Sequence, residues 1–122
     1  MFEICVDYSF AAGHALRGYK GKCENVHGHN YKVRVTVGGE QLNSIGLVMD
    51  FVDLRAAIKA LAECLDHRFM NDIPPFDKIN PSAENLAKYF YDGLEPTTRE
   101  HGLQVQSVTV CETDTTSATF RP

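Results

Sequence analysis

Two stretches of the sequence alternate apolar and polar residues with a strict period of two. In residues 2–10 the even positions are apolar and the odd positions mainly polar, whereas in residues 31–37 the odd positions are apolar. Successive side chains of a β-strand point to opposite faces, so this period predicts two strands that each bury one face and expose the other. Gly38 and Gly39 would end the second strand.

The middle of the chain follows a helical period. Asp50 is a residue type that caps helices, and apolar side chains then recur every three or four positions through residues 51–65. This stripe consists of Phe51, Leu54, Ile58, Leu61 and Leu65. Ser82 can cap a second helix, which we expect to end at Gly93 or before Pro96. The buried side of that helix would include Leu86, Ala87 and Phe90.

The last part of the chain returns to strands. Residues 104–112 are rich in β-branched side chains, and after a turn at 113–116 a short strand at 118–120 could pair back. The order predicts one α+β domain over residues 1–122, in which two helices cover one face of a four-stranded antiparallel sheet. Such a sheet leaves two edges open, which the subunits of an oligomer could pair.

Composition excludes some classes of function. The net charge of −4 and a pI near 5.7 give no electrostatic basis for binding nucleic acid. The N-terminal residues lack the pattern of a signal peptide, and no apolar run is long enough to span a membrane. We therefore expect a cytoplasmic protein with no membrane partner. Its four cysteines are scattered, which in a reducing compartment indicates free thiols.

Three histidines fall on the apolar parity of the two predicted N-terminal strands. His14 continues the even positions of the first strand, and His27 and His29 continue the odd positions of the second strand backwards from Tyr31. Each alone would be interpreted as a hydrogen-bonded residue at a strand end. Three that converge on one face instead favour Zn²⁺, because three neutral imidazoles leave its fourth position open for water or substrate.

Cys23 lies four residues before His27, and its role stays open at this stage. As a fourth ligand it would close the metal shell and make the site structural. A chain of this length with such regular periodicity can bury an adequate core without a metal, which favours the open site.

Other polar residues could belong to the same site. Asp66 and His67 follow the last apolar position of the first helix, and they either end that helix or act as an acid–base pair. Glu112 shares the parity of buried valines and needs a partner, either an arginine or a ligand with two adjacent N–H donors. The basic loop 17–22 could receive phosphate or could be a solvated turn.

Taken together, these residues resemble the 6-pyruvoyltetrahydropterin synthase and 6-carboxytetrahydropterin synthase family. The matching segments occur in the order of the family and cover nearly the whole chain. They are FAAGH (10–14), CENVHGHNY (23–31), GLVMDF (46–51), LDH (65–67), NPSAEN (80–85) and VCET (110–113). The resemblance implies the tunnelling fold (T-fold), in which sheets join edge to edge into trimeric barrels and two trimers form a homohexamer with active sites at subunit interfaces.

The resemblance also implies a role for each candidate residue. The zinc ligands would be His14, His27 and His29. Cys23 would be the catalytic thiol, Asp66 and His67 its acid–base partners, and Glu112 the carboxylate that anchors the 2-amino and N3–H edge of a pterin.

The implied substrate is 7,8-dihydroneopterin triphosphate. The carboxy enzyme cleaves a side-chain carbon–carbon bond and releases acetaldehyde and triphosphate, whereas the pyruvoyl enzyme keeps the carbons and eliminates triphosphate. Cys23 argues against the branch of the family that has glutamate in place of the thiol. The few residues before FAAGH resemble the bacterial carboxy enzymes of queuosine and 7-deazaguanine biosynthesis. A third possibility is a metal-stabilised pterin-binding oligomer without turnover.

Overall fold

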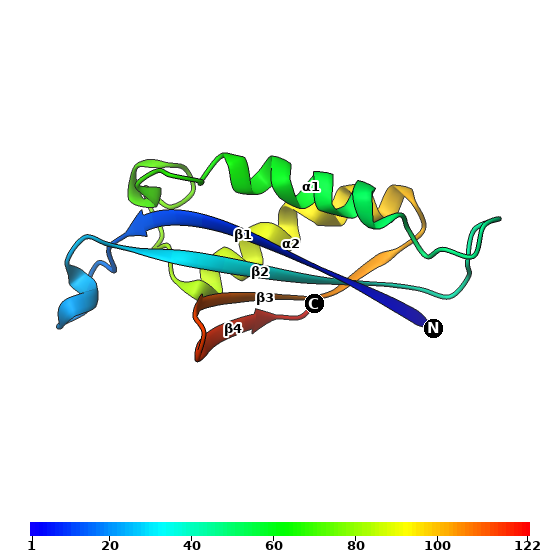
Figure 1. The fold of residues 1–122 in the computed structure, drawn as a ribbon. Coiled ribbons are helices and arrows are strands. Elements are labelled where there is room, and N and C mark those ends of the chain that lie inside the picture. Colours follow the sequence, from blue (N-terminus) through cyan, green and yellow to red (C-terminus); the bar gives the residue numbers. More distant parts are fainter.

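A computed structural model describes residues 1–122 and shows a four-stranded sheet with two helices (Figure 1). The strands are β1 (Phe2–His14), β2 (His27–Gly39), β3 (Gln104–Thr113) and β4 (Thr116–Phe120). The α-helices are α1 (Phe51–Glu63) and α2 (Ala83–Glu100), and two short 3₁₀ helices span Lys22–Glu24 and Met70–Asp72. The predicted fold class and the order of the elements are confirmed.

All neighbouring strands are antiparallel, in the order β1-β2-β3-β4. The hairpin of β1 and β2 pairs without interruption from Phe2 opposite Gly39 to His14 opposite His27. Both strands therefore continue beyond their alternating stretches, as the parity of the histidines predicts. β1 and β4 form the two edges of the sheet.

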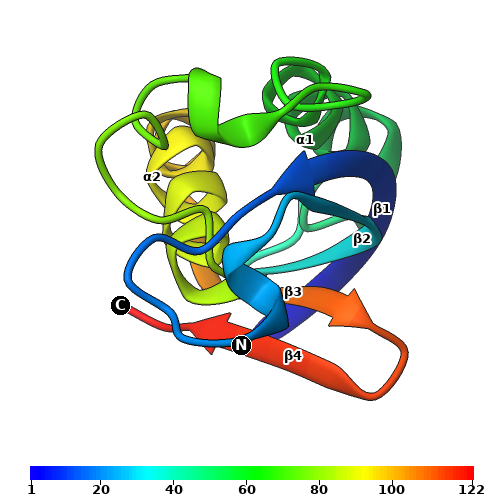
Figure 2. The ribbon, with the colours of Figure 1, turned by 90° about the vertical axis from the view of Figure 1, so that its left-hand side faces the viewer.

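Both helices lie on one face of the sheet, as the view along the strands shows most clearly (Figure 2). The apolar positions of β2 are fully buried beneath them, with Val33, Val35 and Val37 inaccessible to solvent. Asp50 and Ser82 cap α1 and α2 through hydrogen bonds to the N–H groups of Val52 and Asn85. The two caps predicted from the sequence are thus correct.

The predicted end of the second helix is wrong. α2 continues through Pro96 to Glu100, because its apolar face continues with Leu94 and Thr98, both buried. Gly93 permits close helix packing: a Cβ atom there would lie 2.6 Å from a methyl carbon of Leu61 on α1. Gly93 is therefore a contact point between α2 and α1 and does not end the helix.

The first helix also differs in detail. It ends at Glu63, and Leu65 is buried in the turn that follows. Phe51, predicted to belong to the buried stripe, is 55% exposed, whereas Ala62 takes a buried position.

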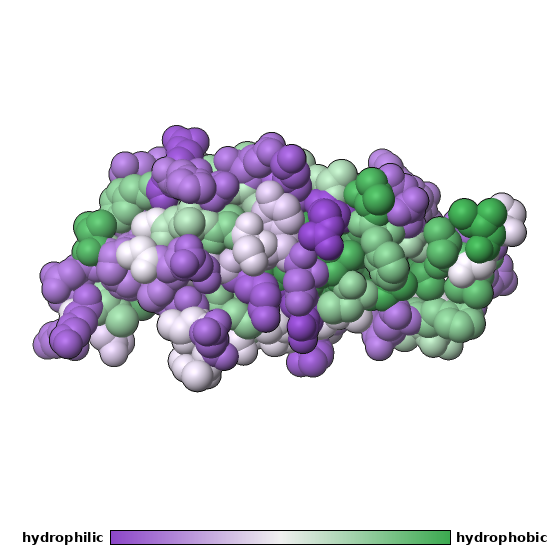
Figure 3. Space-filling model, viewed as in Figure 1, coloured by the Kyte–Doolittle hydropathy of each residue, from purple (hydrophilic) through white to green (hydrophobic).

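The surface has an apolar end remote from the histidines. Figure 3 shows it at the right of the molecule, around the connection from β2 to α1. The exposed apolar residues of this region include Leu42, Ile45, Phe51 and Val52, with Met1 and Phe2 at the start of β1. No helix of the structure combines the length and the apolar character that crossing a membrane requires.

Candidate metal centre and adjoining cavity

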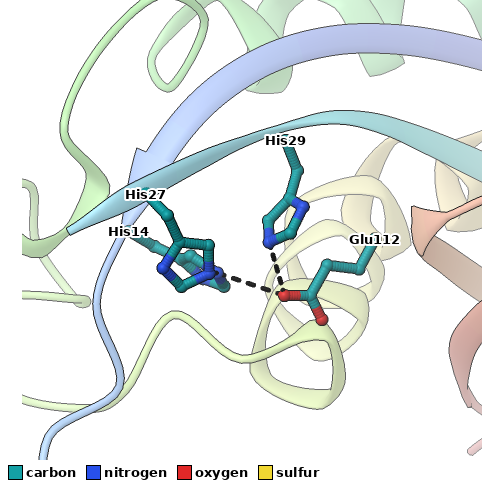
Figure 4. A group of neighbouring side chains, drawn as sticks. All are labelled: His14, His27, His29 and Glu112. Carbon is teal, nitrogen blue, oxygen red and sulfur yellow. Dashed lines mark hydrogen bonds and ion pairs between the residues drawn. The ribbon is translucent and has the colours of Figure 1, made fainter. Parts of the chain in front are cut away.

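The strand register brings the three histidines together with Glu112 (Figure 4). His14 and His27 are opposite each other in β1 and β2, His29 lies two positions along the same face of β2, and Glu112 comes from β3. One donor atom from each of the four side chains lies within 4.8 Å of the others. The predicted convergence of the histidines is confirmed, and Glu112 joins them.

Backbone carbonyls fix the orientation of two of the rings. The Nδ1 atom of His14 lies 2.8 Å from the oxygen of Pro81, and the Nδ1 atom of His27 lies 2.7 Å from the oxygen of Asn25. A carbonyl only accepts, so Nδ1 carries the proton in both rings and Nε2 of the neutral ring is bare. These two Nε2 atoms lie 2.9 Å apart. Two lone pairs at that distance repel each other unless a cation lies between them.

The third histidine is also suited to bind a cation. Burial lowers the pKa of His29, and the nearby imidazoles lower it further, although the Glu112 carboxylate opposes this shift. Its Nε2 atom is buried and lacks a hydrogen bond of acceptable geometry, although Oε1 of Glu112 is 2.8 Å away. The same oxygen lies 3.1 Å from Nε2 of His14. Three histidines beside a carboxylate fit a divalent metal ion such as Zn²⁺.

Cys23 lies beside this group but does not belong to it. It is in the 3₁₀ helix Lys22–Glu24, whose position is fixed in part by a 2.8 Å hydrogen bond from the Leu16 N–H to the Cys23 carbonyl. The thiol is half-buried and lines a cavity of about 360 Å³ together with His27, His29 and Glu112. Glu112, and not Cys23, is the fourth donor near the histidines.

Asp66 and His67 form a side-chain pair just beyond the end of α1. Nδ1 of His67 lies 2.9 Å from Oδ1 of Asp66, and the same oxygen accepts a 3.0 Å hydrogen bond from the N–H of Ala11. His67 has a left-handed backbone, with φ at 59°, and its side chain is 82% exposed. The pair can form because the helix has already ended, so the two side chains need not diverge.

His67 lines a second cavity, of about 460 Å³. Ala11 and Gly13 of β1, with Gly28, His29 and Asn30 of β2, line it beside His67. Apart from His29, these strand positions alternate with those of the metal candidates, so most of the strand lining belongs to the other face of the sheet. The chain therefore brings His14, His27, His29, Glu112 and Cys23 together, whereas His67 lines a second cavity that shares only His29 with the cavity of Cys23.

A clamp behind His14 was not predicted from the sequence. The Arg17 guanidinium donates to the carbonyls of Asn71, Phe76 and Ile79 at 3.2, 2.8 and 3.2 Å. The Asn80 side chain accepts from the Arg17 N–H and donates to its carbonyl, both at 2.9 Å. This segment leads into Pro81, the partner of His14. Of the two readings of the basic loop 17–22, these bonds favour a structural role for Arg17, whereas Lys20 is exposed.

Comparisons with known proteins identify the family of the chain. The family model described as 6-pyruvoyl tetrahydropterin synthase matches residues 3–122. A relative from Aquifex aeolicus named 6-carboxy-5,6,7,8-tetrahydropterin synthase is 33% identical over 158 residues, covering 98% of this chain and 98% of the relative. The human 6-pyruvoyl tetrahydrobiopterin synthase is 43% identical over 79 residues, covering 62% of this chain and 54% of that protein.

A solved structure is similar to this chain over nearly its whole length. The structure of 6-pyruvoyl tetrahydropterin synthase from Caenorhabditis elegans matches with a TM-score of 0.86 and 27% identity, covering 99% of this chain and 95% of that one. The expected resemblance is confirmed, as is the expectation of an enzyme. The chain belongs to the 6-pyruvoyl tetrahydropterin synthase family.

Proposed function

We propose that this chain is a zinc-dependent 6-carboxy-5,6,7,8-tetrahydropterin synthase, a carbon–carbon lyase. Its substrate would be 7,8-dihydroneopterin triphosphate, and its products would be 6-carboxytetrahydropterin, acetaldehyde and triphosphate. The observation that carries the proposal is the set of bare imidazole nitrogens beside a cavity that also contains a thiol. The name of the Aquifex aeolicus relative, which matches along its full length, supports the carboxy reaction.

His14, His27 and His29 would hold the metal. Bound Zn²⁺ would supply a Lewis acid that polarises the hydroxyl groups of the substrate side chain. Glu112 would accept hydrogen bonds from two adjacent N–H groups of the pterin, an arrangement that matches the two oxygens of a carboxylate. One of its oxygens contacts the histidines and the other points away from their rings (Figure 4).

The proton transfers would be divided between Cys23 and the Asp66–His67 pair. Cys23 would act as a thiolate on a proton of the substrate side chain, because it lines the same cavity as the metal candidates. Asp66 would orient and stabilise the His67 imidazole, which transfers the complementary proton. Since His67 is 82% exposed and lines a cavity that shares only His29 with the cavity of Cys23, we propose that it serves the site of a neighbouring subunit.

That arrangement requires a homo-oligomer, which we propose to be a hexamer formed by two trimers. Two features support assembly: β1 and β4 are the edges of an open sheet, and apolar side chains gather at the end remote from the histidines. We further propose a cytoplasmic protein whose product enters queuosine and 7-deazaguanine biosynthesis, on the basis of the resemblance.

The pyruvoyl reaction is the second candidate, because the human relative is 43% identical over 79 residues. The decisive experiment incubates zinc-replete protein anaerobically with 7,8-dihydroneopterin triphosphate and measures acetaldehyde and the pterin product. Acetaldehyde with 6-carboxytetrahydropterin is the expected result. 6-Pyruvoyltetrahydropterin without acetaldehyde would replace the proposal with the sister reaction.

A non-catalytic pterin-binding oligomer is a lower alternative. Cys23→Ala should keep zinc and the fold but lose acetaldehyde release. Cys64→Ala is the matched control, because that exposed thiol lies at the end of α1 and donates only a weak 3.6 Å bond to the Ala60 carbonyl. Wild-type protein that binds pterin without turnover would support the scaffold instead.

A further inference from the structure

Tyr31 has a buried hydroxyl group with no partner. The side chain is inaccessible to solvent, and its oxygen forms no hydrogen bond within the chain. Its ring stacks on Phe10 at a centroid distance of 5.2 Å. The ring also meets the edges of His14 and His29, at 5.8 and 5.5 Å. Tyr31 is therefore packed directly against two of the metal candidates.

An unpaired hydroxyl in this position is unfavourable. Burying it removes its hydrogen bonds to water without replacing them, whereas phenylalanine would fill nearly the same space without that penalty. The rest of the ring is well packed, so the hydroxyl is the one part of this side chain for which the fold supplies no partner. A group that enters or moves within the site could supply its partner.

Glu112 is placed to be that partner. The last pair between β2 and β3 is Lys32 opposite Cys111, so Tyr31 and Glu112 are the next residues of the two strands, and both lie against His14 and His29. A tyrosine hydroxyl is a hydrogen-bond donor, and a carboxylate only accepts. Oε1 of Glu112 lies close to the imidazole nitrogens of His14 and His29.

Those nitrogens are the atoms that would bind a metal ion. The Glu112 carboxylate, freed from them, needs a new hydrogen-bond donor before it can be held in one orientation. We propose that Tyr31 is a positioning residue whose hydroxyl donates to Glu112 in the metal-bound site and directs that carboxylate to the N–H edge of the pterin. This inference rests on the proposed function, because it refines the pterin-anchoring role of Glu112.

The test compares Tyr31→Phe with wild type, using zinc-loaded protein and neopterin as a non-reacting ligand. We expect neopterin to bind about ten-fold more weakly, which corresponds to about 1.4 kcal/mol. The KM for the triphosphate substrate should rise with little change in kcat. Zinc content should stay at the wild-type level, and the metal-free variant should unfold at the wild-type temperature or higher. Tyr89→Phe is the control, since it removes a hydroxyl remote from the site whose contact with the Leu61 carbonyl is a long 3.5 Å.

Glu112→Gln separates this inference from the proposed function. If Glu112→Gln weakens neopterin binding and Tyr31→Phe does not, the inference is wrong and the anchoring role of Glu112 survives. If neither variant weakens binding, the anchoring role itself fails. Combining both substitutions should weaken binding no further than Glu112→Gln alone, because Tyr31 acts through that carboxylate.

The unfolding temperature and zinc content of Tyr31→Phe show whether the hydroxyl positions Glu112 or instead supports the fold. Loss of zinc, a lower unfolding temperature of the metal-free protein or failure to fold would each show that the hydroxyl supports the histidines or the core. Any of these results would overturn the inference. A ten-fold loss of neopterin affinity with intact zinc and an unchanged metal-free fold would support it.

Discussion

Arg17→Met tests whether the clamp behind His14 holds the metal site. The substitution keeps most of the aliphatic stem but removes the donors of three bonds to the carbonyls of Asn71, Phe76 and Ile79. A bond from a charged donor contributes about 1.5–3 kcal/mol when buried, and water replaces part of it at an exposed arginine. We therefore expect the free energy of unfolding to fall by about 1–3 kcal/mol in total.

Urea unfolding of the metal-free protein measures this loss, with an unchanged m-value showing that the unfolded state is unaffected. The same variant should bind zinc about ten-fold more weakly, because the clamped segment carries the Pro81 carbonyl that orients His14. Lys20→Met is the control, since this substitution removes the same positive charge from an exposed side chain of the same loop. Wild-type stability together with a raised KM for the triphosphate substrate would refute the clamp and favour a phosphate-binding role for Arg17.

Two further predictions concern the scaffold. Gly93→Ala should lower the unfolding temperature, because the new methyl group would overlap Leu61. The overlap would cost about 1–3 kcal/mol, which exceeds the gain in helix propensity of about 1 kcal/mol. In a Leu61→Ala background the same change should be neutral or stabilising, and destabilisation in both backgrounds would contradict the packing explanation. Arg34 holds the pKa of Asp7 below its usual value through a 2.8 Å hydrogen bond, so the pair stabilises the fold above the ordinary aspartate pKa and loses this effect as the pH falls through the lowered pKa. Asp7→Asn should therefore reduce the urea midpoint slightly at pH 7 and progressively less at acidic pH, and a difference independent of pH would count against the ion pair.

The sequence predicts the strands and their faces because the period of two carries direct information on which side chains share a face. That is why the meeting of His14, His27 and His29 could be predicted without a structure. The parity of Glu112 was equally informative, since it placed the carboxylate on the same face as Val108 and Val110. Its contact with His14 and His29 depends on the order of the strands in the sheet, which no single segment specifies.

Tertiary contacts explain where the sequence arguments failed. Gly93 and Pro96 are helix-ending residues by local preference, but the close approach of Leu61 and the buried face through Thr98 extend α2 beyond them. The basic residue Arg17 resembles a phosphate ligand in sequence. Its partners are carbonyl groups more than fifty residues away, and backbone acceptors leave no mark on side-chain patterns.

The central claim is that the histidines, and not Cys23, bind the metal. The most direct test is the X-ray absorption spectrum of the zinc-loaded protein, because it distinguishes nitrogen or oxygen ligands from sulfur ligands. Three histidines with an open or oxygen-filled fourth position predict only nitrogen and oxygen neighbours, at about 2.0–2.2 Å. The spectrum of Cys23→Ala should then be the same as that of wild type. A sulfur neighbour at about 2.3 Å in wild type, absent from Cys23→Ala, would make the thiol a ligand and contradict the separation of metal and thiol roles.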